Sequence, residues 1–369
     1  MDRYKMGENT IQSTTRHNTT KASQGWQRLP LAYRVAIGYT NCRKSKESQR
    51  WSMRVSPSHI EEAAHLIDPV FTHSPQFLAE TLSERLGCRL LCKVETVNPI
   101  QSFKGRGADY YLARLASAPN RLVCASAGNF GQGLAFAARK RGWPLTVFAA
   151  ETANPRKVAA SPRLCAGVRL VGQDFDAAKE IGRTTAERAG WTFVEDGREP
   201  EIAEGAGTIA LELCRWPEPL DSILVPLGNG ALLAGIGQWM RTRSPQTRVI
   251  GVCAAGAPAM ERSWRTSSLI VTETATTIAD GIAVRVPVPE ALQALRDVVD
   301  DIVLVEDSIL LEAMRLVFKE LGLLLEPAGA AGIAGVLLLR DQLRGQLVAT
   351  PLCGGNIAPS LIPQVVSVA

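Results

Sequence analysis

The stretch Asn98-Pro-Ile-Gln-Ser-Phe-Lys-Gly-Arg-Gly107 places Lys104 between a predicted strand and a predicted helix. Residues 90–97 are mainly apolar and predict the strand, and residues 108–116 have the composition of a helix. The free N–H groups and the positive dipole end at a helix start disfavour an ammonium ion nearby. Lys104 is therefore expected to react as a neutral amine, for example with a carbonyl cofactor. A solvated surface lysine is the alternative.

Three more junctions of this kind follow along the chain. Strands predicted at 122–125, 223–226 and 347–350 run into glycine-rich turns, and helices predicted at 134–141 and 232–243 follow the first two. Backbone N–H groups in such turns bind phosphate or carboxylate; one turn alone is a weak signal, and four junctions in one chain are a much stronger one. The turns read Ser126-Ala127-Gly128-Asn129-Phe130, Gly228-Asn229-Gly230-Ala231-Leu232 and Cys353-Gly354-Gly355-Asn356.

A dinucleotide site is the alternative for the turn at residue 228. That site needs an acidic residue at the end of the next strand, but the strand predicted at 248–252 ends in Cys253-Ala254-Ala255. A single phosphate is the better interpretation. The four histidines all lie at or before His73, so the later sequence has no imidazole base and Lys104 is the natural one.

The order of these motifs resembles the fold-type II enzymes that use pyridoxal phosphate, the family of the tryptophan synthase β-subunit, and most of all their threonine/serine dehydratase branch. The resemblance covers about residues 55–357 and includes Ile202 to Ala210, Ala279 to Ala283 and Glu326 to Ala330. It implies an α/β fold of two domains, with parallel sheets flanked by helices and the active site in the interdomain cleft. A small substrate-carboxylate domain is expected at 120–196, and a large cofactor-binding domain from 53–119 and 197–369.

The resemblance also implies roles for the residues that match. Lys104 would hold pyridoxal 5′-phosphate as an imine and act as the catalytic base, Phe103 would flank the ring, and Asn129 would bond the ring hydroxyl. Cys353 would face the ring nitrogen. Because a neutral thiol cannot fully protonate the ring, elimination of a β-substituent is favoured over transamination. The substrate carboxylate would contact Ser126, Ala127, Gly128, Asn129 and Phe130, and the phosphate would contact Gly228, Asn229, Gly230, Ala231 and Leu232.

Four departures from the family pattern bear on the reaction. Relatives usually have four glycines at the phosphate turn, whereas this chain reads Gly228-Asn229-Gly230-Ala231, which alters the turn. Phe130 replaces the histidine common in dehydratases, which leaves the substrate side chain open. Ala127 replaces the second acid/base serine of serine racemases, so racemisation is disfavoured. The segment 253–259 offers no side-chain oxygen, and no metal ion is expected there.

The implied activity is that of a lyase that uses pyridoxal phosphate. It would remove the β-hydroxyl of a threonine- or serine-like 3-hydroxy amino acid and release a 2-oxo acid and ammonia. Two alternatives stay open: a β-replacement synthase, which would need an external nucleophile, and a non-catalytic homologue that binds the cofactor. The resemblance also implies a homodimer, and neither nucleic acid nor a membrane is expected as a partner.

Charge and composition set the first part of the chain apart. Residues 1–55 hold 11 of the 41 Lys and Arg but only 3 of the 36 Asp and Glu, and residues 1–52 are predicted to be a basic, disordered extension. A cytoplasmic enzyme is expected, with a mitochondrial transit peptide as the alternative. The longest apolar run, residues 328–339, is too short to cross a bilayer and predicts a core helix. The eight cysteines form no C-x-x-C pair and are expected to be free thiols.

Overall fold

The computed structural model describes residues 53–126, 128–153 and 167–367. The extension predicted at residues 1–52 and the predicted substrate contact Ala127 lie outside these ranges.

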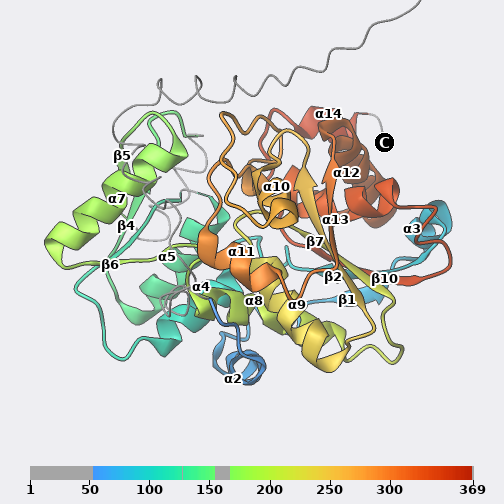
Figure 1. Ribbon diagram of the computed structural model, residues 1–369, viewed down its shortest axis with the longest axis horizontal. Coiled ribbons are helices and arrows are strands. Elements are labelled where there is room, and N and C mark those ends of the chain that lie inside the picture. The colour runs from blue at the N-terminus through green and yellow to red at the C-terminus, as the bar shows by residue number, and fades with distance from the viewer. Residues whose placement is uncertain (1–52, 127, 154–166, 368–369) are drawn as a thin grey trace, which may run out of the picture. The chain divides into compact units, whose positions relative to one another are not determined.

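In the described part of the chain, six strands form the larger of two sheets (Figure 1). β1 pairs with β2 antiparallel, and the other neighbours pair parallel. The central strands are fully buried, as expected for a parallel sheet with helices on both faces. The order across the sheet is β1 (Gln76–Leu78), β2 (Arg89–Val94), β10 (Leu347–Leu352), β7 (Ser222–Pro226), β8 (Arg248–Ala254) and β9 (Asp301–Val305).

Helices surround this sheet and connect its strands. They are α2 (Pro57–Leu66), α3 (Glu80–Leu86), α4 (Lys104–Arg114), α8 (Pro200–Leu213), α9 (Ala231–Arg243), α10 (Ala259–Thr266), the 3₁₀ helix η3 (Asp280–Ile282), α11 (Pro289–Leu295), α12 (Asp307–Leu321), α13 (Pro327–Leu338) and α14 (Ile362–Val366).

The two faces of the large sheet bury different sets of side chains. From β7, Ile223 and Val225 join the apolar cluster that includes residues of α8 and α9. Leu224, between them, joins the cluster that includes residues of α12 and α13. This alternation follows from the strand pleat. Figure 1 shows the same arrangement, with α8 and α9 on one side of the strands and α12 and α13 on the other.

The smaller sheet has four parallel strands. Helices α5 (Asn129–Arg141) and α7 (Phe175–Ala189) pack against this sheet (Figure 1). All six elements lie within residues 120–196, the segment predicted as the small domain, although the division into domains itself stays a prediction. The strand order is β5 (Gly167–Leu170), β4 (Leu145–Ala149), β3 (Leu122–Cys124) and β6 (Thr192–Phe193).

Helix α4 carries Lys104 as its first residue and packs closely on α8. A Cβ atom on Gly107 would lie 2.4 Å from the carbonyl oxygen of Ile202, and one on Gly205 would lie 2.7 Å from that of Arg106. Separations this short leave no room for a side chain. The backbones of α4 and α8 are therefore in direct contact, which fixes the position of the helix start.

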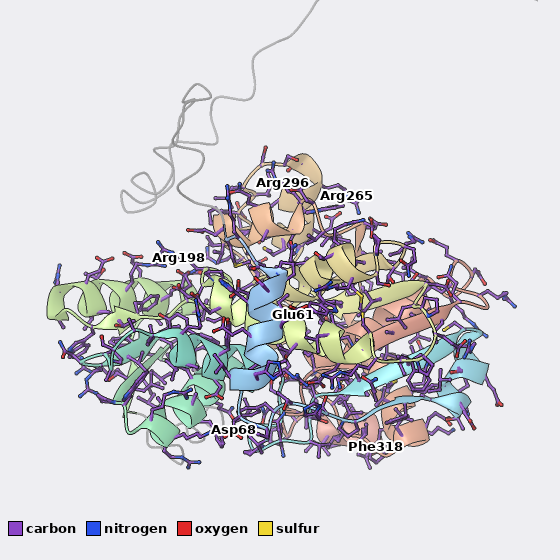
Figure 2. The ribbon with its side chains drawn as sticks, turned by 90° about the horizontal axis from the view of Figure 1, so that it is seen from below. Glu61, Asp68, Arg198, Arg265, Arg296 and Phe318 are labelled. Atoms are coloured by element: carbon purple, nitrogen blue, oxygen red, sulfur yellow. The ribbon has the colours of Figure 1, made fainter. Side chains whose placement is uncertain are left out.

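Helix α2 lies across α8 and α9, as Figure 2 shows around Glu61. Glu61 forms an ion pair with Arg243 of α9. Nδ1 of His59 lies 3.0 Å from Oε1 of the buried Glu204 on α8, and the Ser56 N–H donates to the same oxygen at 3.0 Å. These contacts join the start of the described chain to the helices behind the site.

Two helix starts differ from the sequence prediction. α4 begins at Lys104 and not at residue 108, and α5 begins at Asn129 and not at residue 134. Glycines near both starts lower helix propensity, so the sequence pattern indicates a later start in each case. The structure explains the glycines by close packing: a Cβ atom on Gly105 would lie 2.3 Å from the ring of Phe71, and one on Gly131 would lie 1.7 Å from the carbonyl oxygen of Ser126.

The described cysteines are free thiols, as expected. Cys214 is exposed and the others are buried; they are Cys88, Cys92, Cys124, Cys253 and Cys353. Cys42 and Cys165 lie outside the described residues. The run at 328–339 forms the buried helix α13, and in the described ranges no helix combines the length and apolar character that a bilayer span requires.

Candidate active site

The residues predicted to hold the cofactor, apart from Asn129, follow three neighbouring parallel strands, β2, β10 and β7. The carboxyl ends of parallel strands meet at one edge of a sheet, where ligands commonly bind. Lys104 follows β2, Cys353 follows β10, and the turn at 228–232 follows β7. The first two segments are joined directly, because the N–H of Phe103 donates to the carbonyl oxygen of Cys353 at 3.1 Å.

The loop before Lys104 is held by its own polar groups. The side-chain oxygen of Asn98 accepts from the N–H groups of Ile100 at 3.1 Å and Ser102 at 3.3 Å. Its Nδ2 donates to the carbonyl oxygen of Ser102 at 3.1 Å. Such local bonds explain why asparagine precedes the turn. They fix the approach of the chain to the first residue of α4.

A cavity of about 650 Å³ opens at this edge of the large sheet. It is also lined by residues that follow strands of the smaller sheet, so both sheets contribute to it. Every predicted site residue that the structure describes lines this cavity; Ala127 is outside the described residues. The structure therefore brings together Phe103, Lys104, Ser126, Gly128, Asn129, Phe130, Gly228, Asn229, Gly230, Ala231, Leu232 and Cys353.

Lys104 is mostly buried and forms an ion pair inside the cavity. Its Nζ lies 2.7 Å from Oδ2 of Asp196, and the two side chains are 16% and 12% exposed. The same nitrogen lies 4.7 Å from the ring centre of Phe103 and 6.0 Å from that of Phe130. The amine is thus held between two aromatic rings and one carboxylate. A solvated surface position for Lys104 is excluded.

The turn after β7 leads into the start of α9 and is closely packed at its glycines. Gly230, at the N-cap of α9, has a φ of 101°. A Cβ atom on Gly228 would lie 2.9 Å from the carbonyl oxygen of Gly281, and one on Gly230 would lie 2.9 Å from Cβ of Ala291. The first N–H groups of a helix have no acceptor within the helix. The backbone N–H groups at the start of α9, next to Gly230, could therefore bind an anion.

Asn129 is held by the side chains of Glu326, at the N-cap of α13, and of Asn356, which follows β10. Its Nδ2 donates to Oε1 of Glu326 at 2.5 Å, and its Oδ1 accepts from Nδ2 of Asn356 at 2.8 Å. Nδ2 of Asn356 also donates to the carbonyl oxygen of Ile100 at 2.8 Å. A Cβ atom on Gly354 would lie 1.9 Å from Oε1 of Glu326, so a side chain there would displace this carboxylate. These bonds set the direction of the Asn129 amide.

Cys353 places a neutral thiol in the cavity. The residue is 5% exposed, and its Sγ lies 3.8 Å from the carbonyl oxygen of Ala328. Burial raises the pKa of this thiol, and the nearby Glu326 acts in the same direction. A thiol in these surroundings keeps its proton. The position predicted to face a ring nitrogen therefore offers no anion.

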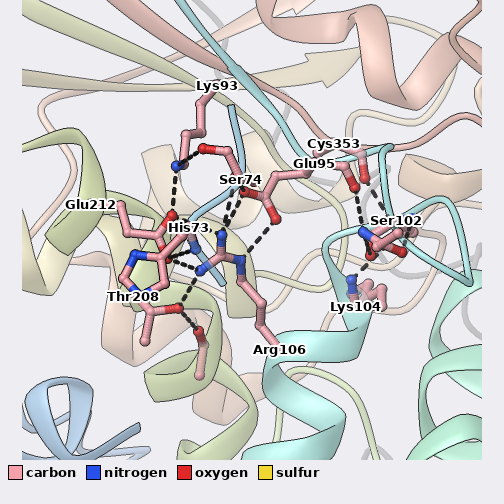
Figure 3. Close-up of polar contacts among 12 residues, drawn as sticks. His73, Ser74, Lys93, Glu95, Ser102, Lys104, Arg106, Thr208, Glu212 and Cys353 are labelled. Carbon is pink, nitrogen blue, oxygen red and sulfur yellow. Dashed lines mark hydrogen bonds and ion pairs between the residues drawn. The ribbon is translucent and has the colours of Figure 1, made fainter. Parts of the chain in front are cut away.

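A buried group of ionised side chains lies near Lys104 and includes Arg106 of the same helix (Figure 3). The guanidinium of Arg106 donates to Glu95 and to Glu212 at distances of 2.7–3.1 Å. Nζ of Lys93 donates to Glu212 at 2.5 Å. Burial alone would raise the pKa of Glu212, but Arg106 and then Lys93 outweigh it and lower that pKa to about 2. The group joins β2, α4 and α8, and it anchors the helix that begins at Lys104.

Several of these residues were not assigned roles from the sequence. The sequence pattern assigns no role to Asp196, which lies shortly after the end of β6 in the phrase Val194-Glu195-Asp196-Gly197. A carboxylate at a strand end beside a glycine is the signal that could have found it. Glu326 belongs to the segment Glu326 to Ala330 and Arg106 to the stretch 98–107, but the sequence pattern assigns neither residue a function.

Known proteins resemble this chain over most of its length. The family described as "Pyridoxal-phosphate dependent enzyme" matches residues 67–354. The chain is 33% identical over 308 residues to L-threo-3-hydroxyaspartate ammonia-lyase of Pseudomonas sp., covering 83% of this chain and 97% of that protein. It is 38% identical over 290 residues to L-threonine ammonia-lyase of Geobacter sulfurreducens, covering 77% of this chain and 71% of that protein.

A solved structure supports the same assignment. Threonine deaminase isoform 2 from Solanum lycopersicum, in its processed form, superposes with a TM-score of 0.78 at 28% identity. The match covers 85% of this chain and 89% of that chain. The α/β fold and the cofactor predicted from the sequence are confirmed. The chain belongs to the family of pyridoxal-phosphate dependent enzymes.

Proposed function

We propose that the protein is an ammonia-lyase that removes the β-hydroxyl of a 3-hydroxy amino acid and releases a 2-oxo acid and ammonia. The observation that carries this proposal is the position of Lys104. Its amine lies in the same cavity as the glycine-containing turn at 228–232 and the neutral thiol of Cys353. The named relatives act as ammonia-lyases of threonine and of L-threo-3-hydroxyaspartate, which supports the same reaction type for this chain.

The residues present fit pyridoxal phosphate. The turn at 228–232 would offer helix-start N–H groups to a phosphate, and neighbouring atoms already occupy the space that a side chain at Gly228 or Gly230 would need. Phe103 would flank the ring, Asn129 would bond its hydroxyl, and Cys353 would meet its nitrogen. When bound, pyridoxal phosphate draws electrons from the substrate Cα and so makes the proton there removable.

The chain's own residues would bind the substrate and move its proton. The start of α5, with Gly128 as its N-cap and Asn129 and Phe130 as its first residues, offers N–H groups that would suit the substrate carboxylate, and Ser126 lines the same cavity. The loop is tight because no side chain fits at Gly131. Once its amine is free, Lys104 would accept the Cα proton at Nζ. A neutral thiol at Cys353 would not fully protonate the ring nitrogen, which would favour loss of the β-substituent over transamination.

The charge of the cavity wall bears on which substrate side chains would fit. Its basic residues Lys104, Lys179 and Arg285 are each paired with a carboxylate. A second substrate carboxylate would therefore meet like charge. Neutral side chains such as those of threonine and serine fit better than that of 3-hydroxyaspartate. The acidic lining residues, seven in number, are Asp174, Asp176, Glu195, Asp196, Glu273, Asp280 and Glu326.

A substrate screen tests the proposal. Purified protein loaded with pyridoxal phosphate is expected to release 2-oxo acid from L-threonine and L-serine, with a higher kcat/KM than for L-threo-3-hydroxyaspartate. Product formed only in the presence of an added nucleophile would instead identify a β-replacement synthase. Absence of product from every 3-hydroxy amino acid would contradict the proposal. The homodimer and the cytoplasmic location expected from the sequence stay predictions.

A further inference from the structure

We propose that Asp196 is a second catalytic residue, which passes a proton from Lys104 to the departing β-hydroxyl. The inference rests on the proposed function, because it concerns the leaving group of that reaction. In that reaction a proton leaves Cα, and the oxygen on the neighbouring carbon must receive a proton before it departs. A carboxylate beside the amine can carry the proton between these two positions.

The contacts of Asp196 suit this task. Its Oδ2 lies 2.7 Å from Nζ of Lys104, and the residue lines the cavity. Its other oxygen, Oδ1, is buried and has no hydrogen-bond partner among the described residues. Buried carboxylate oxygens are nearly always bonded, so an oxygen left open beside a substrate cavity points to a partner that arrives with the substrate. A hydroxyl is such a partner.

The position of Asp196 is fixed from two sides. The N–H of Val194 donates to the carbonyl oxygen of Val123 at 2.8 Å, which ties the segment to the smaller sheet. Gly197 has a φ of 89°, and a Cβ atom there would lie 2.5 Å from the carbonyl oxygen of Asn229. Nδ2 of Asn229 also lies 3.4 Å from Oδ2 of Asp196. The carboxylate of Asp196 is thus held between the smaller sheet and the turn at 228–232.

Neighbouring carboxylates are engaged elsewhere. Glu195 pairs with Arg183 at 2.7 Å and with Lys179 at 3.3 Å. Glu326 accepts from Asn129 at 2.5 Å. Asp196 is the carboxylate that the described structure places in contact with the Lys104 amine. The choice of this residue therefore follows from its geometry.

The proton transfers balance. Lys104 takes the proton from Cα, and the electron pair of that bond becomes part of the new double bond between Cα and Cβ. Oδ2 of Asp196 takes a proton from the Lys104 ammonium, and the carboxylic acid gives its proton to the β-oxygen. The bond between Cβ and oxygen breaks with its electron pair on oxygen, which leaves as water. Lys104 ends as a neutral amine and Asp196 as a carboxylate.

A pair of substrates with different leaving groups tests this assignment. Hydroxide needs a proton to leave, whereas the chloride of β-chloro-L-alanine does not. In Asp196→Asn, kcat for L-serine is expected to fall by about 10²–10⁴-fold, and kcat for β-chloro-L-alanine by less than about tenfold. Asp196→Glu, which keeps an acid, is expected to recover part of the L-serine activity. Asp68→Asn is the matched control, because Asp68 forms a 2.7 Å pair with Lys140 outside the cavity.

The ratio of the two kcat values decides the result, because it does not depend on how much variant is folded and loaded. A ratio equal to that of the wild type overturns the proposal and leaves Asp196 as a structural partner of Lys104. Absorbance titration of the apo-protein with pyridoxal phosphate is expected to give the same affinity for the wild type and Asp196→Asn. A wild type that acts on β-chloro-L-alanine but on no 3-hydroxy amino acid would instead refute the proposed function.

Discussion

Replacing Lys104 by alanine is expected to lower kcat for 2-oxo acid release by about 10²–10⁴-fold, the usual contribution of a positioned acid or base. The amine lies in the cavity, within 2.7 Å of Asp196 and between the rings of Phe103 and Phe130. In the described structure no other lysine or histidine contacts this carboxylate. Loss of the amine therefore removes both the proposed attachment point and the base. Initial rates with L-threonine under saturating cofactor measure the effect.

Lys140→Ala is the matched control for this prediction. Lys140 also forms a 2.7 Å ion pair with an aspartate, Asp68, but its side chain is 55% exposed and it does not line the cavity. Its replacement is expected to leave kcat within about twofold, since exposed ion pairs contribute little even to stability. Full turnover by Lys104→Ala would contradict the assigned chemistry.

Replacing Arg106 by methionine is expected to lower the free energy of unfolding by about 3–5 kcal/mol, the usual cost of removing one partner of a buried ion pair. Arg106 is fully buried and bonds to Glu95 and Glu212. Methionine keeps much of the volume but none of the donors, so two buried carboxylates lose their main cation. Lys93 would still reach Glu212, at 2.5 Å. Urea denaturation followed by circular dichroism measures the change.

Arg114→Met supplies the comparison on the same helix. Arg114 pairs with Glu62 at 2.9 Å, but both side chains are more than a third exposed. Such a pair typically contributes about 0–1 kcal/mol. The two variants therefore differ in burial and not in residue type or element. Equal losses of stability in the two would contradict the structural role given to the buried ionic group.

Much of the site follows from sequence order alone. Lys104, Cys353 and the turn at 228–232 each follow an apolar strand, and parallel strands bring such turns to one edge of a sheet. Glycines at positions 228 and 230 indicated close approach of backbone, and the structure shows why each is required. The residues that local patterns could place are therefore those fixed by a strand end and a turn.

The remaining part of the site depends on pairing between distant segments. Lys104 and Asp196 are 92 residues apart, and Asn129 and Glu326 are 197 apart. Nothing local in the sequence says which carboxylate meets which partner, because several acidic residues follow strand ends or precede helices. The helix starts at Lys104 and Asn129 were misplaced for a related reason: glycines that lower helix propensity are needed there for packing against other segments.

Sequence also could not give the balance of charge around the cavity. Net charge is +5 for the whole chain, yet the described lining has seven acidic and three basic residues. The basic excess belongs to the first part of the chain, and the acids gather from segments that are far apart in the sequence. The preference proposed for neutral substrate side chains rests on this local balance.

Borohydride reduction of the loaded enzyme tests the central assignment most directly. Reduction makes the bond between cofactor and amine permanent, so that digestion and mass spectrometry can locate it. The label is expected on the peptide that contains Lys104, with loss of the cofactor's visible absorbance and of all turnover. A label on another lysine, or no bound cofactor after reconstitution with pyridoxal 5′-phosphate, would contradict the account.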